Sequence, residues 1–195
     1  PGKIIKSING GINWNYLPQQ YAIYSLIRIF TDKVNSNRIV TTAKTSSGSN
    51  DPNYTGTLFS NNGGQTFGTP FGGYYKPVDF ELAEDVLFYD ANKIIILLPN
   101  KILKTENNGV TWNQVSSPNF KKIVGDPSNN ILFATTENSV YNSVDGGVSW
   151  QFLYSNNSII NSIVLIDYLG GKTPIISTEE GVFVLKNGNF TWLSS

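Results

Sequence analysis

Hydrophobic positions in this chain are grouped in short runs that alternate with polar segments rich in Gly, Asn, Asp and Ser. The runs are rich in Val, Ile, Leu, Phe and Tyr, which favour extended strands, and the intervening residue types favour turns. Residues 21–30 are the only stretch that could also form a helix, and we interpret them as a strand. The pattern therefore predicts an all-β protein.

The runs recur in a fixed order, in which a first apolar run is followed by a β-branched run and then by a short third strand. First runs occupy residues 21–30, 78–89, 120–124 and 159–167. Second runs occupy 38–42, 93–98, 130–136 and 173–178, and third runs occupy 3–6, 55–59, 101–104, 139–142 and 181–185. A brief fourth segment completes each unit. Four strands in about 40–50 residues are typical of a β-propeller blade.

An eight-residue motif follows the third run of every unit. Its copies lie at residues 7–14, 60–67, 105–112, 143–150 and, in a more divergent form, 185–192. The shared pattern is Ser/Thr, any residue, Asp/Asn, Gly/Asn, Gly, any residue, Thr/Ser/Asn, Trp/Phe. All 4 Trp residues occupy the last position, and the closing aromatics are 38 to 53 residues apart, so the repeat is genuine.

Each motif position has a mechanical reason. The hydroxyl and the Asp/Asn side chain accept hydrogen bonds from backbone N–H groups of a tight hairpin loop, and glycine permits positive φ. The closing aromatic supplies a large apolar area beneath the loop. The residues to which we assign this structural role are Ser7, Asn9, Gly11, Trp14, Ser60, Asn62, Gly64, Phe67, Thr105, Asn107, Gly109, Trp112, Ser143, Asp145, Gly147, Trp150, Asn187 and Trp192.

The five copies resemble the bacterial neuraminidase repeat, or Asp-box, found in sialidases, sortilin-type receptors, some large glucanases and photosystem assembly factors. The resemblance covers essentially the whole chain and implies a single β-propeller domain, 1–195, of four-stranded antiparallel blades. About five blades are expected, a partial one at 1–20 and complete ones at 21–73, 74–118, 119–156 and 157–195. Since the first unit is only the outer half of a blade, either closure is unusual or the chain belongs to a longer propeller.

Composition excludes several kinds of chemistry. With 0 Cys and 0 His, disulfides, thiol catalysis and Cys/His zinc sites are ruled out. The 14 Lys and Arg residues form no cluster, which argues against nucleic-acid binding. No apolar run approaches the ~20 residues that span a bilayer. We therefore expect no cofactor, no metal, no nucleic acid and no membrane insertion.

The surface chemistry is unusual because only 14% of residues are charged, and Asn, Ser and Thr supply most of the polarity. Such a surface favours an extracellular, cell-surface or virion protein, although an AT-rich genome would produce the same bias. Asn53, Asn156 and Asn189 stand in Asn-x-Ser/Thr sequons and are candidate N-glycosylation sites.

The resemblance raises the question of catalysis. A sialidase of this family needs three arginines around its substrate carboxylate, and this chain has only Arg28 and Arg38. Another glycosidase needs two facing carboxylates, but the doublets Glu84-Asp85 and Glu179-Glu180 consist of adjacent residues, which point to opposite faces of a strand. We predict no catalytic residue in this chain.

Oxygen ligands for calcium could come from two polar segments, which are better explained as turns. The residues concerned are Asn50, Asp51 and Asn53 in the first segment and Asp126, Ser128 and Asn129 in the second.

Binding is the remaining class. The family's ligand face lies opposite the motif loops, where residues 41–54 form a long polar loop containing Asn50, Asp51 and Tyr54. Tyr74 and Tyr75, in the linker 71–77, either form a platform for a sugar or a partner, or pack between units. We expect a non-catalytic recognition or scaffold propeller that binds glycan or protein. The alternatives are a glycoside hydrolase, or its propeller part, and an architectural unit of a surface layer, filament or virion.

Overall fold

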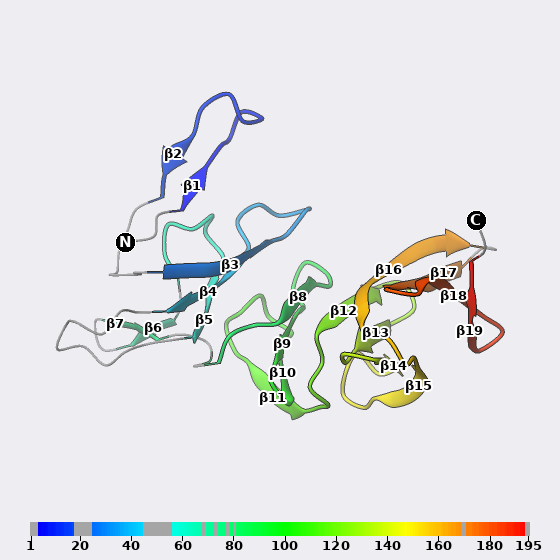
Figure 1. Cartoon of the computed structure of the whole chain (residues 1–195). Helices are drawn as coiled ribbons and strands as arrows, with labels where there is room; N and C mark the ends of the chain where they lie inside the picture. The colour runs from blue at the N-terminus through cyan, green and yellow to red at the C-terminus, as the bar shows by residue number, and fades with distance from the viewer. Residues whose placement is uncertain are drawn as a thin grey trace. The chain divides into compact units, whose positions relative to one another are not determined.

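A computed structural model of the chain shows strands and turns in the residues that it describes, which are 4–17, 25–44, 56–67, 69–71, 74–76, 79, 81–168 and 171–193 (Figure 1). They fall into two compact units, Pro1–Ala83 and Glu84–Ser195. Within the described ranges, no helix is long and apolar enough to cross a membrane.

The unit Glu84–Ser195 consists of three antiparallel sheets, each a meander of four strands (Figure 1). The first sheet contains β8 (Asp85–Phe88), β9 (Ile94–Leu98), β10 (Lys101–Thr105) and β11 (Asn113–Ser116). The second contains β12 (Lys122–Asp126), β13 (Ile131–Thr135), β14 (Ser139–Ser143) and β15 (Gln151–Ser155). The third contains β16 (Ile160–Tyr168), β17 (Gly171–Thr178), β18 (Gly181–Lys186) and β19 (Asn189–Trp192). Strand β12 contacts both β8 and β16, as inner strands do around a propeller hub, so the predicted all-β blade architecture is confirmed.

The core of this unit lies between the sheets. One cluster joins the first two sheets and contains Tyr89, Ile95, Leu97, Ile102, Phe120, Ile123, Leu132 and Ala134. A second cluster joins the last two sheets and contains Phe133, Val140, Ile160, Ile163, Ile176 and Phe190. Leu132 and Ala134 belong to one cluster and Phe133 to the other, because successive residues of β13 point to opposite faces. The middle sheet is therefore buried on both faces, as in stacked blades.

The unit Pro1–Ala83 contains a three-stranded sheet and two hairpins. The sheet is formed by β3 (Ser25–Thr31), β4 (Ile39–Lys44) and β5 (Gly56–Ser60). One hairpin pairs β1 (Ile5–Lys6) with β2 (Asn15–Tyr16), and the other pairs β6 (Thr69–Phe71) with β7 (Tyr74–Lys76). Residues 41–44, predicted as the start of a long loop, are the end of β4, where they complete the ladder to β3.

The blade expected over residues 21–73 stays a prediction, and its described residues include the three-stranded sheet β3–β5. The N–H of Thr57 donates to the carbonyl of Asp79 at 2.8 Å, and its hydroxyl donates to the carbonyl of Glu81 at 2.7 Å and accepts from the N–H of Ala83 at 2.9 Å. These bonds place a downstream segment along the edge of β5, where the fourth strand was expected. Strand β6 pairs instead with β7, so Tyr74 and Tyr75 lie in a strand and not in an irregular linker.

The fifth motif copy also departs from the prediction. Residues Asn187 and Gly188 form a two-residue turn between β18 and β19, with φ values of 50° and 81° that are typical of a type I′ hairpin. Leu185 stands at the position of the motif hydroxyl, so the bonds that would hold a longer loop cannot form. The expected motif loop at 185–192 is therefore replaced by a tight hairpin.

Candidate functional site

The four other motif copies form nearly identical loops, which we call the motif loops (residues 7–14, 60–67, 105–112 and 143–150). In every one, the first hydroxyl accepts a hydrogen bond from the N–H of the fifth residue, a glycine, at 2.8 to 2.9 Å. The third side chain accepts from the N–H of the seventh residue at 2.9 to 3.0 Å. The fourth and fifth residues have positive φ in all four loops. The hydrogen bonds join residues of the same loop, so these side chains serve to hold its shape.

Asp145 is the one carboxylate at the third position of a motif loop, and it makes more bonds than the asparagines. It accepts from the hydroxyl of Ser149 at 2.5 Å, from the N–H of Ser149 at 2.9 Å and from the N–H of Val148 at 3.0 Å. These hydrogen bonds, led by that of the Ser149 hydroxyl, hold the pKa of Asp145 far below its usual value. Asp145 is therefore a fixed anion within the loop.

The closing aromatics differ more than the motif predicts. Phe67 is buried, and Trp112 and Trp150 are half-buried, but Trp14 and Trp192 are 58% and 63% exposed. The indole N–H of Trp14 donates to the carbonyl of Gly11 at 3.0 Å, so this ring is attached to its own loop. The closing aromatic is therefore mostly covered at Phe67, Trp112 and Trp150 and mostly exposed at Trp14 and Trp192.

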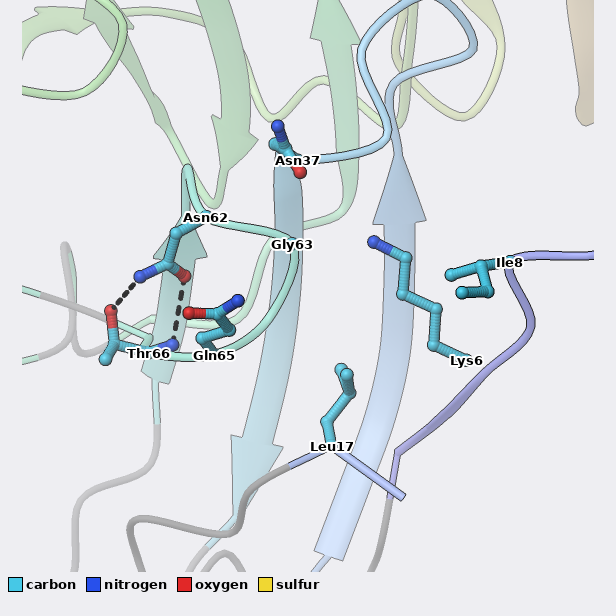
Figure 2. Close-up of a pocket in the computed structure, with 8 residues that line it drawn as sticks. All are labelled: Lys6, Ile8, Leu17, Asn37, Asn62, Gly63, Gln65 and Thr66. Carbon is cyan, nitrogen blue, oxygen red and sulfur yellow. Dashed lines mark hydrogen bonds between the residues drawn. The ribbon is translucent and has the colours of Figure 1, made fainter. Parts of the chain in front are cut away.

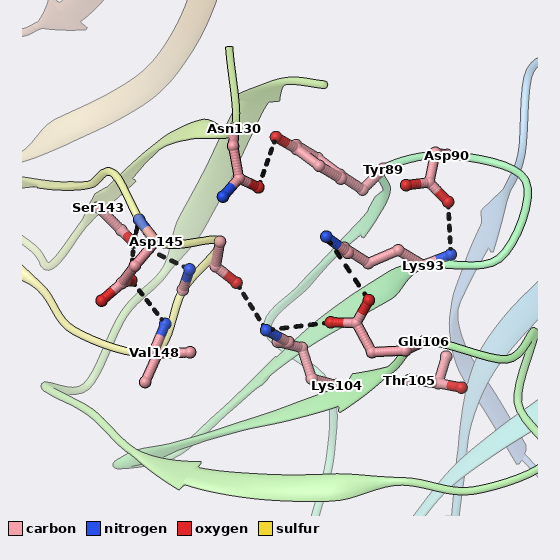
Figure 3. A network of polar contacts seen from close by, with 12 residues as sticks. Tyr89, Asp90, Lys93, Lys104, Thr105, Glu106, Asn130, Ser143, Asp145 and Val148 are labelled. Carbon is pink, nitrogen blue, oxygen red and sulfur yellow. Dashed lines mark hydrogen bonds and ion pairs between the residues drawn. The ribbon is translucent and has the colours of Figure 1, made fainter. Parts of the chain in front are cut away.

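A lysine of the preceding repeat contacts the motif loop 143–150 (Figure 3). Lys104, in β10, donates to the carbonyl of Gly146 at 2.9 Å and is paired with Glu106 at 3.2 Å. Glu106 is also 3.5 Å from the ammonium of Lys93. Asn130 approaches the same loop, since a Cβ added to Gly146 would lie 3.1 Å from its Oδ1. We call this meeting of Lys104, Asn130 and Gly146 the second joint.

Tyr89 borders the second joint (Figure 3). Burial, together with the charges of Asp126 and Asp90, raises the pKa of Tyr89, so its hydroxyl stays protonated. The hydroxyl donates to the carbonyl of Asp126 at 2.9 Å, and its ring lies under the Lys93 ammonium at 5.1 Å. The charged and polar groups here satisfy one another.

An equivalent arrangement in the unit Pro1–Ala83 leaves a pocket open. Lys6, at the end of β1, points toward Asn37 and the motif loop 60–67 (Figure 2). Its ammonium donates to the carbonyl of Ser36 at 3.2 Å. A Cβ added to Gly63 would lie 2.9 Å from the Lys6 nitrogen and 3.1 Å from Oδ1 of Asn37. We call this meeting of Lys6, Asn37 and Gly63 the first joint.

The pocket at the first joint has a volume of about 480 Å³ (Figure 2). It is lined by Lys6, Ile8, Leu17, Asn37, Asn62, Gly63, Gln65 and Thr66. Asn62 is engaged within its loop, because its amide donates to the Thr66 hydroxyl at 2.8 Å and its oxygen accepts from the Thr66 N–H at 3.0 Å. The lining therefore combines an ammonium, amide groups and two aliphatic side chains, which suits a polar ligand group with an aliphatic stem.

The residues predicted to bind a ligand do not line this pocket. Asn50, Asp51 and Tyr54 lie outside the described residues, as does the sequon residue Asn53. The structure describes only the backbone of Tyr74 and Tyr75, so their platform stays a prediction.

The two acidic doublets do not form facing pairs. Glu84 is paired with Lys121 at 3.0 Å, and Asp85 accepts from the N–H of Ile123 at 3.0 Å. Glu180 lies in the turn before β18 and accepts from the hydroxyl of Ser158 at 2.6 Å. These contacts agree with the interpretation of the doublets as strand-end and turn residues.

Asp126 belongs to a turn rather than to an open ligand set. Its carboxylate accepts from the hydroxyl of Ser128 at 2.6 Å and from the amide of Asn129 at 2.7 Å. The hydrogen bond from the Ser128 hydroxyl is the main cause that lowers the pKa of Asp126. In the part of the chain that the structure describes, no group of three or more acidic side chains could hold a metal.

The two arginines have local partners. Arg28 donates to the carbonyl of Ala83 at 3.1 Å. Arg38 is buried in an ion pair with Asp32, to which its Nε donates at 2.7 Å. Burial opposes ionisation of Asp32, but hydrogen bonds from the Val34 N–H and from Arg38 lower its pKa overall. Both arginines thus contact residues of their own unit.

The two described sequons differ in accessibility. The side-chain nitrogen of Asn156 is buried, and its oxygen accepts from the N–H of Ser158 at 3.3 Å. Asn189 begins β19 and is exposed. Of these two, only the Asn189 amide is open to a modifying enzyme in the folded chain.

No protein-family model and no curated protein sequence matches the chain, but solved structures do. An ancestral GH74 enzyme has a TM-score of 0.68 and 18% identity, covering 97% of this chain and 28% of the enzyme. YCF48 bound to D1 peptide has a TM-score of 0.55 and 17% identity, covering 91% of this chain and 56% of YCF48. A chain of a nidogen/laminin complex has a TM-score of 0.55 and 15% identity, covering 88% of this chain and 64% of that chain. This chain therefore spans less than two thirds of the length of each.

These similar structures are β-propeller proteins, and the likeness shows the propeller fold alone. They include an enzyme and proteins seen with a peptide or a protein partner, so the fold does not decide between catalysis and binding. The pocket at the first joint was missed by sequence reasoning, although one signal was present. A lysine precedes the motif hydroxyl at both Lys6 and Lys104, but the residue after the hydroxyl is Ile8 in one repeat and Glu106 in the other.

Proposed function

We propose that this chain is a non-catalytic recognition or scaffold propeller of the Asp-box type that binds a protein partner, and that the pocket at the first joint holds a group of that partner. The observation that carries the proposal is the lining of this pocket, in which an ammonium, amides and aliphatic side chains surround about 480 Å³. Such groups supply orientation and affinity for a polar group. The four motif loops, with their shared hydrogen bonds, support the Asp-box assignment.

The comparisons add support for a protein partner. One similar structure is bound to a peptide and another belongs to a protein complex. The alternative of a glycoside hydrolase rests on the GH74 similarity, but the doublets Glu84-Asp85 and Glu179-Glu180 do not present two carboxylates across one cleft. An extracellular or surface location is part of the proposal, supported by the low charge content and by the exposed sequon at Asn189.

The test is a binding screen on peptide and glycan arrays, followed by titration of each hit against two variants. Gln65→Trp fills the pocket, and Gln114→Trp places the same bulk on β11, where Gln114 is also exposed. We expect peptide hits whose affinity is lost in Gln65→Trp and kept in Gln114→Trp. Hits that bind both variants equally, or a screen without peptide hits, would refute binding at this pocket.

A further inference from the structure

The first and second joints are similar contacts made by corresponding residues of two repeats, although Lys104 donates to the carbonyl of Gly146 and Lys6 donates to the carbonyl of Ser36. In each, the lysine before the motif hydroxyl reaches the first glycine of the following motif loop, Lys6 at Gly63 and Lys104 at Gly146. In each, an asparagine lies against that glycine, and a Cβ added there would be 3.1 Å from its Oδ1. The contacts of Lys104 in the second joint can therefore be compared with those of Lys6 in the first joint.

The joints differ at the residue after the motif hydroxyl, and the second joint also contains the ammonium of Lys93, 3.5 Å from Glu106. In the second joint the residue after the hydroxyl is Glu106, whose carboxylate lies 3.2 Å from the Lys104 ammonium. In the first joint it is Ile8, which carries no charge and is 85% exposed. The Lys6 ammonium donates to the carbonyl of Ser36, which is neutral. This bond uses one of the three N–H donors of the ammonium.

The pocket lies beside this ammonium, at the joint where the repeat lacks its carboxylate. The Lys6 ammonium has unused donors and lies in a concave site whose other polar side chains are uncharged. Such a cation attracts a carboxylate more strongly than it attracts a neutral group. The second joint supports a carboxylate ligand as well, because the corresponding lysine, Lys104, is paired with the carboxylate of Glu106.

We propose that the pocket at the first joint binds the carboxylate of a glutamyl or aspartyl side chain of the protein partner, with Lys6 as its counter-ion. This inference rests on the proposed function and specifies the ligand group. Ile8 and Leu17 contact the methylene stem of that side chain, and the amides of Asn37 and Gln65 bind its peptide groups. A peptide is favoured over a uronic acid because none of the lining residues is aromatic, and sugar rings stack on aromatic faces.

The experiment measures binding of the tripeptide acetyl-Gly-Glu-Gly-amide to the full chain by NMR titration, beside its neutral Gln counterpart and methyl glucuronide. We expect the Glu peptide to bind at least ~10-fold more tightly than the Gln peptide, with affinity that falls as ionic strength rises. Lys6→Gln should abolish this preference.

A second variant places a carboxylate at the first joint without removing the lysine. Ile8→Glu should pair with Lys6 as Glu106 pairs with Lys104, and so should weaken the Glu peptide by at least ~10-fold. Ile12→Glu is the matched control, because Ile12 lies in the same motif loop and is 80% exposed. It adds the same charge outside the pocket and should leave the affinity nearly unchanged.

The outcomes separate this inference from the proposed function. Equal binding of the Glu and Gln peptides, or equal effects of Ile8→Glu and Ile12→Glu, would overturn the carboxylate assignment. Array hits that are lost in Gln65→Trp would still support the proposed function in that case. Preferential binding of the glucuronide would assign the lysine to a sugar ligand and overturn the peptide inference. Absence of binding by all three probes at about 10 mM would also overturn it.

Discussion

The clearest energetic prediction concerns Trp150, which closes the motif loop 143–150. More than half of this side chain is buried, and it packs against the core cluster between the first two sheets of its unit. Its ring centroid lies 4.8 Å from that of Phe120, with the two rings tilted by 58°. Trp192 closes the divergent fifth copy in the same unit, and its side chain is 63% exposed. The two tryptophans therefore form a matched pair that differs in burial.

The expected cost of truncation follows from the area that each ring removes from water. Burial of roughly 170 Å² by Trp150, at about 25 cal/mol per Å², gives about 4 kcal/mol for Trp150→Ala. The smaller covered part of Trp192, roughly 90 Å², gives about 2 kcal/mol for Trp192→Ala. Trp150→Ala should thus destabilise the fold by about 2 kcal/mol more than Trp192→Ala.

The assay is equilibrium unfolding in guanidinium chloride followed by far-UV circular dichroism, which does not depend on the tryptophans as fluorophores. Because both residues lie in the unit Glu84–Ser195, they affect the same part of the chain, and equal m-values would show that the midpoints report stability. A cost below about 1 kcal/mol for Trp150→Ala, or one no larger than that of Trp192→Ala, would refute the placement of Trp150 in the core.

Three further predictions concern the same unit. Gly147→Ala should lower the free energy of unfolding by about 1–2 kcal/mol, because φ of Gly147 is 87° and the new Cβ would lie 3.2 Å from Leu132. The control Gly171→Ala adds a Cβ in open space and should change this free energy by less than about 0.5 kcal/mol, so equal effects would contradict the prediction. The lowered pKa of Asp145 contributes stability above about pH 4 that is lost on further acidification, so the difference in Tm between wild type and Asp145→Asn should shrink from about pH 6 to about pH 2, and a constant difference would argue against it. Folded protein secreted by eukaryotic cells should carry glycan on Asn189 and not on Asn156, as read by peptide mass spectrometry, because a glycan on the buried Asn156 amide is incompatible with the fold; folded protein with glycan on Asn156 would contradict this.

The blade architecture was predictable because its signals are local. The motif itself, the β-branched runs and the glycine-rich turns each act within a few residues, and in the unit Glu84–Ser195 they yield three four-stranded sheets. The edge of β5 was not predictable in the same way, because its partner lies in a later segment of the chain, at Asp79. The Thr57 hydroxyl, by bonding to Glu81 and Ala83, favours the downstream segment, and this contact spans more than 20 residues. The tight hairpin at Asn187 could have been anticipated from Leu185, which cannot supply the motif's acceptor.

The candidate site was harder to predict than the fold. Sequence reasoning sought a ligand on the loop face opposite the motif, where residues 45–55 lie outside the described structure. The pocket depends on the distance between the hairpin β1–β2 and the motif loop 60–67, and no local pattern reports that distance. Ile8 occupies the second position of the motif, where the pattern allows any residue. Its proximity to the pocket follows only from the contact of Lys6 with the next repeat.

A repeat protein offers a way to separate structural from functional use of the same residue. In both joints the lysine and asparagine contact the glycine of the next motif loop, so these contacts serve packing of one repeat on the next. Packing alone does not require the lysine to lack a carboxylate, because Lys104 contacts the next loop while it pairs with Glu106, which Lys93 also approaches. The fold therefore does not require an uncharged residue such as Ile8 at the position that Glu106 occupies in the second joint. Lys6 lies beside a pocket and lacks the carboxylate partner that Lys104 has, so we interpret it as the counter-ion of an external anion.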